Sequence, residues 1–150
     1  MKVQDVMTKD AVFCKVQDNL ATAAELMKQR DCSILPIIND EKKVAGMISD
    51  RDICIAVTNN VKPADINVAD FTVKKVIYCQ ATDKIEDALK KMKKNQLKRL
   101  PVTSQDGSLI GIISVTDVLL ATDKHKSLRK KVVSTLKSIS KLRPILLREF

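Results

Sequence analysis

The sequence predicts an α+β fold made of two copies of one β-α-β-β-α unit, related by a pseudo-twofold axis. The main observation is an internal repeat. Shifted by 65 residues, the chain matches itself without a gap from Val3 to Val57, and 15 of the 55 aligned pairs are identical. A register held over that length indicates a duplication. Each copy also alternates short β-branched runs with segments of helical periodicity, and neither copy has enough elements to bury a core alone.

The first strand and helix of the unit are predicted within residues 11–30. AVFC at 11–14 is a short apolar run, suited to a buried strand. Asp18 is a suitable N-cap, and the residues behind it predict an amphipathic helix over roughly 19–30. The apolar positions with helical spacing are Leu20, Ala23, Ala24 and Met27.

The rest of the unit is a hairpin followed by a second helix. SILPII (33–38) and VAGMIS (44–49) predict two strands, because both are rich in β-branched or apolar residues and a polar turn separates them. DRDICIAV (50–57) begins the second helix. The second copy has the same order, with QDG (105–107) in its hairpin turn.

The repeats are expected to span residues 1–57 and 68–122, joined by a linker at 58–67 that contains Asn, Pro and Asp, the usual loop formers. Residues 123–150 are not repeated. This tail has 9 Lys/Arg against 2 Asp/Glu and so carries +7 of the chain's net charge of +9. Helical spacing of its apolar residues predicts an amphipathic helix, which Arg143–Pro144 is expected to end. Those apolar residues are Leu128, Val132, Leu136 and Ile139.

The composition excludes several classes of protein. A chain with 45% hydrophobic and 30% charged residues is expected to be soluble and globular. Aromatic residues make up only 3%, which argues against a protein that stacks bases on exposed rings. No apolar run approaches the ~20 residues that cross a bilayer. The first residues lack the apolar core of a signal peptide, so a cytoplasmic location is expected.

The cysteines and the single histidine predict neither a metal site nor catalysis. The four cysteines are scattered, none forms a C-x-x-C pair, and His125 lies far from them in sequence. We expect small buried thiols in a reducing compartment. The chain also shows no convincing nucleophile–base pair and no P-loop, so we predict that it is not an enzyme.

A Gly-x-x-Ser-x-x-Asp motif occurs once in each repeat, where the last strand meets the last helix. Its members are Gly46, Ser49 and Asp52, and Gly111, Ser114 and Asp117. One interpretation is a capping box, in which serine and aspartate satisfy the free N–H groups of the helix start. The other is a ligand site, because an ionised aspartate can accept both hydroxyls of a cis-diol and a helix start favours phosphate. The glycine removes a side chain where another backbone, or a ligand, comes close.

The tandem unit, its LPV-type strands at 34–37 and 99–102 and the doubled motif resemble a pair of CBS domains, the Bateman module. The resemblance covers about residues 1–122. It implies that an adenosine nucleotide or related adenosyl compound binds in clefts between the repeats, and that the chain is a regulatory sensor and a disc-shaped homodimer. It also implies that the motif serine lies near the phosphates and that the aspartate binds the ribose diol.

The resemblance assigns residues to two clefts that are not alike. In the cleft of Ser114 and Asp117, Arg99 precedes the LPV strand and can bind phosphate, and the adenine would lie against Ile112 and the segment Thr8–Val12, which includes Ala11. The other cleft would use Ser49, Asp52, Met47 and the segment Lys74–Ile77. It has Ile34 in place of Arg99. The Asp117 cleft is therefore expected to bind the tighter or more phosphorylated ligand.

The predicted function is a stand-alone module that senses AMP, ATP or NAD and regulates a separate partner protein. The basic tail supports an alternative, in which residues 124–148 bind nucleic acid or another anionic surface and the repeats are a scaffold. A third possibility for the tail is that its apolar stripe packs on the module or on a second subunit.

Overall fold

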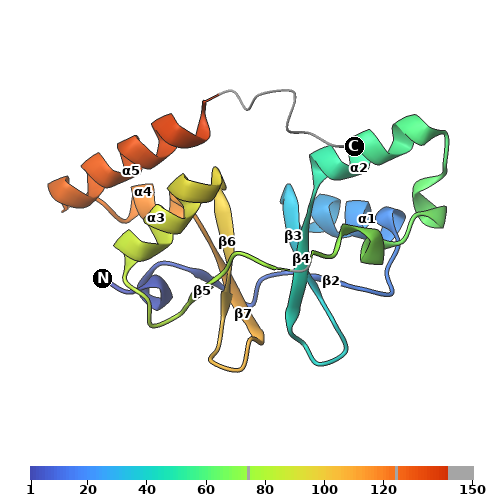
Figure 1. Cartoon of the computed structure of the whole chain (residues 1–150), viewed down its shortest axis with the longest axis horizontal. Helices are drawn as coiled ribbons and strands as arrows, with labels where there is room; N and C mark the ends of the chain where they lie inside the picture. The colour runs from blue at the N-terminus through green and yellow to red at the C-terminus, as the bar shows by residue number, and fades with distance from the viewer. Residues whose placement is uncertain (74, 124, 142–150) are drawn as a thin grey trace.

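The computed structural model of the chain describes residues 1–73, 75–123 and 125–141. It confirms the α+β prediction, with two sheets side by side and helices packed on each (Figure 1). Half 1 contains the three-stranded sheet, in the order β2-β3-β4, with helices α1 and α2. Half 2 contains the four-stranded sheet, in the order β1-β7-β6-β5, with helices α3, α4 and α5.

Half 1 follows the predicted unit closely. Its elements are β2 (Cys14–Lys15), α1 (Leu20–Arg30), β3 (Ile34–Ile38), β4 (Val44–Ser49) and α2 (Asp50–Ala56). β2 runs parallel to β3, and β3 and β4 form the antiparallel hairpin. Its core is aliphatic, with Leu35, Ile37 and Ile48 fully buried. The linker adds two short 3-10 helices, η2 (Val57–Asn59) and η3 (Pro63–Asp65), and η3 lies against α1.

Half 2 repeats this plan. Its elements are β5 (Cys79–Gln80), α3 (Ile85–Asn95), β6 (Arg99–Thr103), β7 (Leu109–Ser114) and α4 (Val115–Leu120). β5 runs parallel to β6, and β6 and β7 form the hairpin. Leu89, Met92, Leu100 and Ile113 lie at the centre of this second core. The turns of both hairpins are at the same end of the molecule, opposite the helices (Figure 1).

The first residues of each repeat cross over to the other half. β1 (Thr8–Lys9) pairs antiparallel with β7, and Val3 from η1 (Val3–Asp5) is fully buried in the core of half 2. In return, η4 (Val68–Phe71) lies against β4, and Val68 is buried in the core of half 1. We call residues 1–9 and 68–73 the exchanged arms. Because of them, each core depends on both repeats.

The motif glycines make room for these arms. A Cβ on Gly111 would lie 2.6 Å from the Thr8 carbonyl oxygen, and one on Gly46 would lie 2.7 Å from that of Phe71. Carbon–oxygen contacts normally begin near ~3.3 Å. Of the two reasons anticipated for the glycine, the structure shows the close approach of another backbone.

The predicted basic helix is present as α5 (Lys126–Ile139) and packs on the module itself. Val132 is fully buried and Leu128 nearly so, against α3 and α4. Lys93 Nζ donates to Ser134 Oγ at 2.9 Å, and Gln96 Nε2 donates to the Ser138 carbonyl at 3.1 Å. The helix ends at Ile139, and the predicted stop at Arg143–Pro144 lies outside the described residues.

Two local predictions were wrong. The strand expected at 11–14 is reduced to β2 at Cys14–Lys15, because only these two residues pair with β3. Asp18 does not cap α1; its carboxylate accepts from the Lys15 N–H at 2.8 Å and so closes the preceding turn. Asn19 is the N-cap, and its Oδ1 accepts from the Thr22 N–H at 2.9 Å.

No helix among the described residues is long and apolar enough to span a membrane.

Candidate functional site

The serine and aspartate of each motif form a complete capping box. Asp117 Oδ2 accepts from the Ser114 N–H and from Ser114 Oγ, both at 2.7 Å, and Ser114 Oγ accepts from the Asp117 N–H at 3.0 Å. Ser49 and Asp52 make the same three bonds at 2.8, 2.7 and 3.2 Å. In both copies these bonds use one carboxylate oxygen, Oδ2. The cap therefore leaves Oδ1 of each aspartate available to a ligand hydroxyl.

Five residues predicted for the Asp117 cleft line one cavity of about 330 Å³. They come from the first arm, the loop behind it, β6 and β7. They are Thr8, Ala11, Val12, Arg99 and Ile112. The strand register explains part of this arrangement, since Thr8 is paired directly with Ile112 across β1 and β7. The exchanged arm therefore brings a residue of the first repeat onto the last strand of the second.

Ser114 and Asp117 lie beside this cavity rather than in its lining. Arg99 and Ser114 are direct partners across β6 and β7, so their side chains leave the same face of the sheet. Ser114 is largely buried, and Asp117 is half-buried. Arg99 thus connects the lining of the cavity to the start of α4.

The residues predicted for the Asp52 cleft are not brought together in one cavity. Asp52 lines a groove of about 680 Å³ with Ile55, Val61 and other residues of α2 and the linker. Ile77 lines a different groove, beside α3. Met47 and Ser49 face Pro36 and Ile34 across the β3–β4 hairpin, and Lys74 lies outside the described residues. The two sites are thus built differently, despite the repeat.

Three residues of the 330 Å³ cavity lie outside the positions predicted for it from the sequence. They are Arg30, Cys32 and Ile34. Arg30 is the most informative, because it places a second guanidinium on the same cavity as Arg99. It is the last residue of α1, where a cation is favourable near the helix C-terminus in any case, so the sequence offered no reason to assign it to a ligand. Asp10 has a left-handed backbone, with φ 52°, directly after β1.

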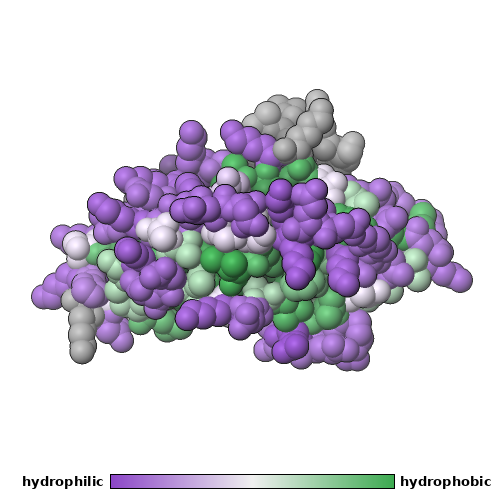
Figure 2. Space-filling view, turned by 90° about the horizontal axis from the view of Figure 1, so that it is seen from below, coloured by the Kyte–Doolittle hydropathy of each residue, from purple (hydrophilic) through white to green (hydrophobic). Residues whose placement is uncertain are grey.

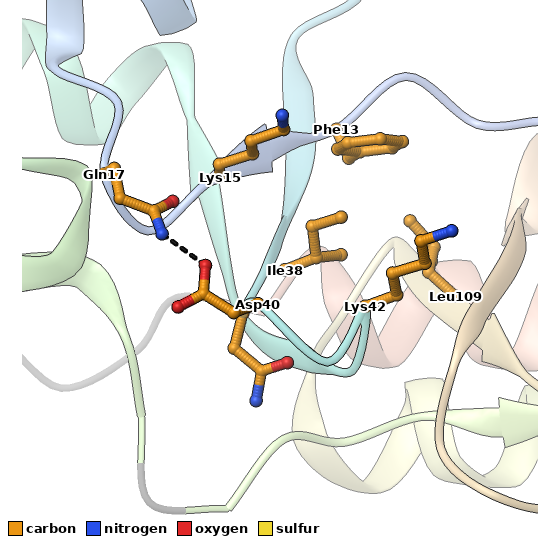
Figure 3. A pocket seen from close by; sticks show the side chains of 8 residues that line it. Phe13, Lys15, Gln17, Ile38, Asp40, Lys42 and Leu109 are labelled. Atoms are coloured by element: carbon orange, nitrogen blue, oxygen red, sulfur yellow. Dashed lines mark hydrogen bonds between the residues drawn. The ribbon is translucent and has the colours of Figure 1, made fainter.

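A separate depression of about 610 Å³ lies at the hairpin end of the molecule. Figure 2, seen from this end, shows hydrophobic surface in the middle of the face and hydrophilic residues around it. In Figure 3, Phe13, Ile38 and Leu109 lie around the depression, and Gln17 donates a hydrogen bond to Asp40 at its rim. Its lining thus combines residues of both halves. It could not be predicted from the sequence, because Phe13 and Ile38 fit the strand pattern.

The two cysteines that the repeats share are structural. Cys14 and Cys79 are fully buried, and desolvation raises the pKa of each thiol to about 12. They are therefore protonated and unreactive at neutral pH. Among the described residues, no group of three or more His, Cys, Asp or Glu side chains is placed to hold a metal ion.

Comparison with protein families agrees with this architecture. The CBS domain model matches residues 3–59 and 68–124 of the chain. The chain belongs to the CBS domain family. The two matches correspond to the two repeats, so the module is a CBS pair, as the repeated motif implied.

Several known CBS proteins are similar over most of this chain. The uncharacterized protein YlbB of Bacillus subtilis is 28% identical over 83% of the chain and 84% of its own length. The crystal structure of Hypoxic Response Protein I with two coordinated zinc ions has a TM-score of 0.74 and 27% identity, covering 80% of this chain and 98% of that one. The crystal structure of CBSX2 in complex with AMP has a TM-score of 0.69 and 25% identity, covering 81% and 95%.

One enzyme is also similar, but only over a small part of its length. The inosine-5'-monophosphate dehydrogenase of Methanocaldococcus jannaschii is 30% identical over 87% of this chain, which corresponds to 25% of the enzyme. The similarity therefore gives no information about the other three quarters of that enzyme.

Proposed function

We propose that this CBS pair is a regulatory module that binds an adenosine nucleotide, AMP, ATP or NAD, in the cavity between its halves. One observation carries the proposal: the lining of the 330 Å³ cavity combines the apolar side chains of Val12 and Ile112 with two arginines, Arg30 and Arg99. Apolar surface suits a purine ring, and paired arginines suit phosphate oxygens. The volume is at the lower end of the range for small-molecule sites, about 300–1,000 Å³.

The capping box adds a contact for the sugar. Asp117 keeps Oδ1 for a ribose hydroxyl, while Oδ2 holds the start of α4. Ser114 lies opposite Arg99, so the start of α4 is next to the arginine, while the Ser114 hydroxyl already donates to Asp117 Oδ2. The AMP complex of CBSX2, at 25% identity, supports an adenosyl ligand for this fold and sequence.

The two sites are proposed to differ in affinity. Arg99 has no basic counterpart in the first repeat, where Ile34 occupies the matching position, and both Arg99 and Ile34 line the Asp117 cavity. The Asp117 site then binds a nucleotide more tightly, or binds a more phosphorylated nucleotide, and the Asp52 site binds nucleotide weakly.

Regulation is proposed to act on a separate protein and to involve a homodimer. Bound nucleotide can shift the arrangement of the halves only if it has unequal affinity for two arrangements. Leu120 of α4 is 72% exposed, and Ile55 of α2 and Val57 of η2 are exposed as well, which gives a second copy apolar surface to cover. Light scattering of the wild type and of Leu120→Lys tests this, because a dimer built on this surface dissociates in the variant.

Calorimetric titration of AMP, ATP and NAD tests the nucleotide proposal. Arg99→Ala is expected to weaken binding about 10- to 100-fold, the range for one hydrogen bond to a charged group. Lys98→Ala is the matched control, because the side chain is exposed, adjacent and outside the cavity. Equal effects of the two substitutions contradict the site. Equal losses for Asp117→Ala and Asp52→Ala contradict the difference between the two sites.

Binding of a nucleic acid or another anionic surface by α5 is a second candidate, favoured by its exposed basic residues. They include Arg129, Lys130, Lys131 and Lys137. Truncation cannot test it, because Leu128 and Val132 belong to the core of half 2. Lys130→Gln combined with Lys137→Gln keeps the core. A salt-dependent loss of duplex DNA binding in this variant supports the candidate, and wild-type protein that does not bind DNA excludes that partner.

A further inference from the structure

A lysine-rich groove of about 580 Å³ lies beside α3, outside the 330 Å³ cavity. Its lining includes Lys75 and Ile77 of the segment that the resemblance assigned to the Asp52 cleft, whereas Asp52 itself lines another groove. Four lysines line it, Lys75 from the loop before β5 and Lys90, Lys91 and Lys94 from α3. Among the described residues of the lining Asp83 is the only acidic one, so these residues carry a net charge of +3. Val76, Ile77 and Tyr78 add apolar surface to the lining, and Tyr78 is 45% exposed.

The carboxylate of Asp83 already has partners within the protein. Asp83 Oδ2 accepts from the Gln80 N–H at 3.0 Å and pairs with Lys91 Nζ at 3.2 Å. Lys91 also donates to the Tyr78 carbonyl at 3.0 Å, which fixes its ammonium group at the wall. Lys90 pairs with Asp87 at 3.0 Å, but both side chains are exposed and such pairs are weak.

Lys75 and Lys94 make no ion pair or side-chain hydrogen bond within the described part of the chain. Lys90 and Lys94 are also four residues apart on one helix, where like charges repel each other and destabilise the helix. The groove therefore holds an excess of positive charge that the protein does not balance. An anion that contacts several of these lysines relieves the repulsion.

The first repeat shows that the fold does not require these lysines. At the positions 65 residues earlier, Lys75, Lys90, Lys91 and Lys94 are replaced by Asp10, Glu25, Leu26 and Gln29. The helix there, α1, has the same length as α3, 11 residues, and packs on its sheet in the same way. By contrast the aromatic position is kept, as Phe13 and Tyr78. The four lysines are thus specific to half 2 rather than to the architecture.

We propose that this groove binds a small ligand with two or more linked phosphate groups. Several separate ammonium groups match the spaced charges of a phosphate chain better than they match a single small anion. The Tyr78 ring also gives a base or other flat group a surface to stack on. The source can be a nucleoside polyphosphate or inorganic polyphosphate, since the phosphate chain is the shared feature. The site needs no adenosine and is independent of Asp117.

Titration of inorganic tripolyphosphate, without divalent metal, into the whole chain tests this. We expect one site, weakened by added NaCl. Lys94→Gln and Lys90→Glu introduce the first-repeat residues. Lys94→Gln is expected to weaken binding about 3- to 10-fold, the range for one charge-assisted bond at an exposed site, and Lys90→Glu is expected to weaken it further because it reverses the charge. Lys130→Gln on α5 removes the same charge outside the groove and is expected to leave binding unchanged. Comparing how much Lys94→Gln weakens ATP and tripolyphosphate distinguishes the two sources, because Lys94 lines the groove and not the nucleotide cavity.

AMP titration of the same variants separates this proposal from the nucleotide cavity, because Lys90 and Lys94 lie outside that cavity. Unchanged AMP binding with weakened tripolyphosphate binding supports a distinct site, whatever the outcome for Asp117→Ala. The proposal is overturned if tripolyphosphate gives no heat, or if Lys130→Gln weakens it as much as Lys94→Gln. It is also overturned if Asp117→Ala abolishes tripolyphosphate binding, or if only an acidic peptide or oligonucleotide is bound in a Lys94-dependent way.

Discussion

Substituting Gly111 by alanine should release the first exchanged arm. The new Cβ would lie 2.6 Å from the Thr8 carbonyl oxygen and 3.2 Å from Met7 Sδ. A normal carbon–oxygen contact begins near ~3.3 Å, so β1 has to move away by about 0.7 Å. The backbone of an antiparallel pair cannot retreat that far and keep its hydrogen bonds at full strength.

The cost can be bounded from two sides. Overpacking of a tight contact costs about 1–3 kcal/mol. Complete release of the arm also exposes Val3, whose burial contributes about 1.5–3 kcal/mol. We therefore expect Gly111→Ala to lower the free energy of unfolding by about 2 kcal/mol, with the arm partly detached rather than the fold lost.

Urea unfolding followed by circular dichroism measures this loss, and amide exchange at Thr8 and Lys9 shows where it occurs. Gly107→Ala is the control: its φ of +87° also disfavours alanine, but its Cβ would meet only Lys43, at 3.9 Å. We expect Gly107→Ala to lower the free energy of unfolding by about 1–2 kcal/mol through backbone strain, without changing amide exchange at Thr8. Only Gly111→Ala should also weaken nucleotide binding. If Gly111→Ala is as stable as the wild type and Thr8 stays protected, the explanation of this glycine is wrong.

Three further substitutions test other parts of the structure. Ser114→Ala removes the N-cap of α4 and should cost about 1 kcal/mol in urea unfolding; no change would mean that the cap is not stabilising. Leu128→Ala should cost about 2–5 kcal/mol, because the side chain is in the core of half 2, and a loss below 1 kcal/mol would place α5 outside the cooperative unit. Burial raises the pKa of the Cys79 thiol from 9.0 to about 12, so the unfolded chain loses this proton first and stability should fall as the pH rises from about 9 toward 12. Cys79→Ala should reduce that slope, and an unchanged slope would refute the contribution of this thiol.

The duplication made most of the fold predictable, because it supplied two independent versions of each element. The strand expected at 44–49 matches β4 residue for residue, and the helix expected at roughly 19–30 matches α1 closely. Hydrophobic periodicity reports which residues are buried, and both elements bury one face. The length of the strand at 11–14 was overestimated, because the apolar pattern reports burial and not the number of residues that pair with the neighbouring strand.

The exchanged arms and the full lining of the cavity could not be predicted from periodicity. Val3 is apolar, so its burial is expected, but the sequence around it does not indicate that it is buried in half 2 rather than in half 1. Arg30 lies at the end of α1, where a cation is expected without any ligand. The family resemblance, rather than the residue pattern, placed Thr8 opposite Ile112, and the strand register shows how the first arm makes that contact possible.

Positions that differ between the two repeats indicate function better than positions that are identical. Where the repeats are identical, the structure often shows a requirement of the backbone: Gly46 and Gly111 admit the arms, and each motif serine caps a helix. Both repeats share these constraints, so identity alone does not distinguish a binding site from a well-formed fold. Where the repeats differ in charge, as at Arg99 and Lys94, the same architecture exists without the charge in the other half. The fold therefore does not explain these charges, and a ligand of half 2 gives a reason for them.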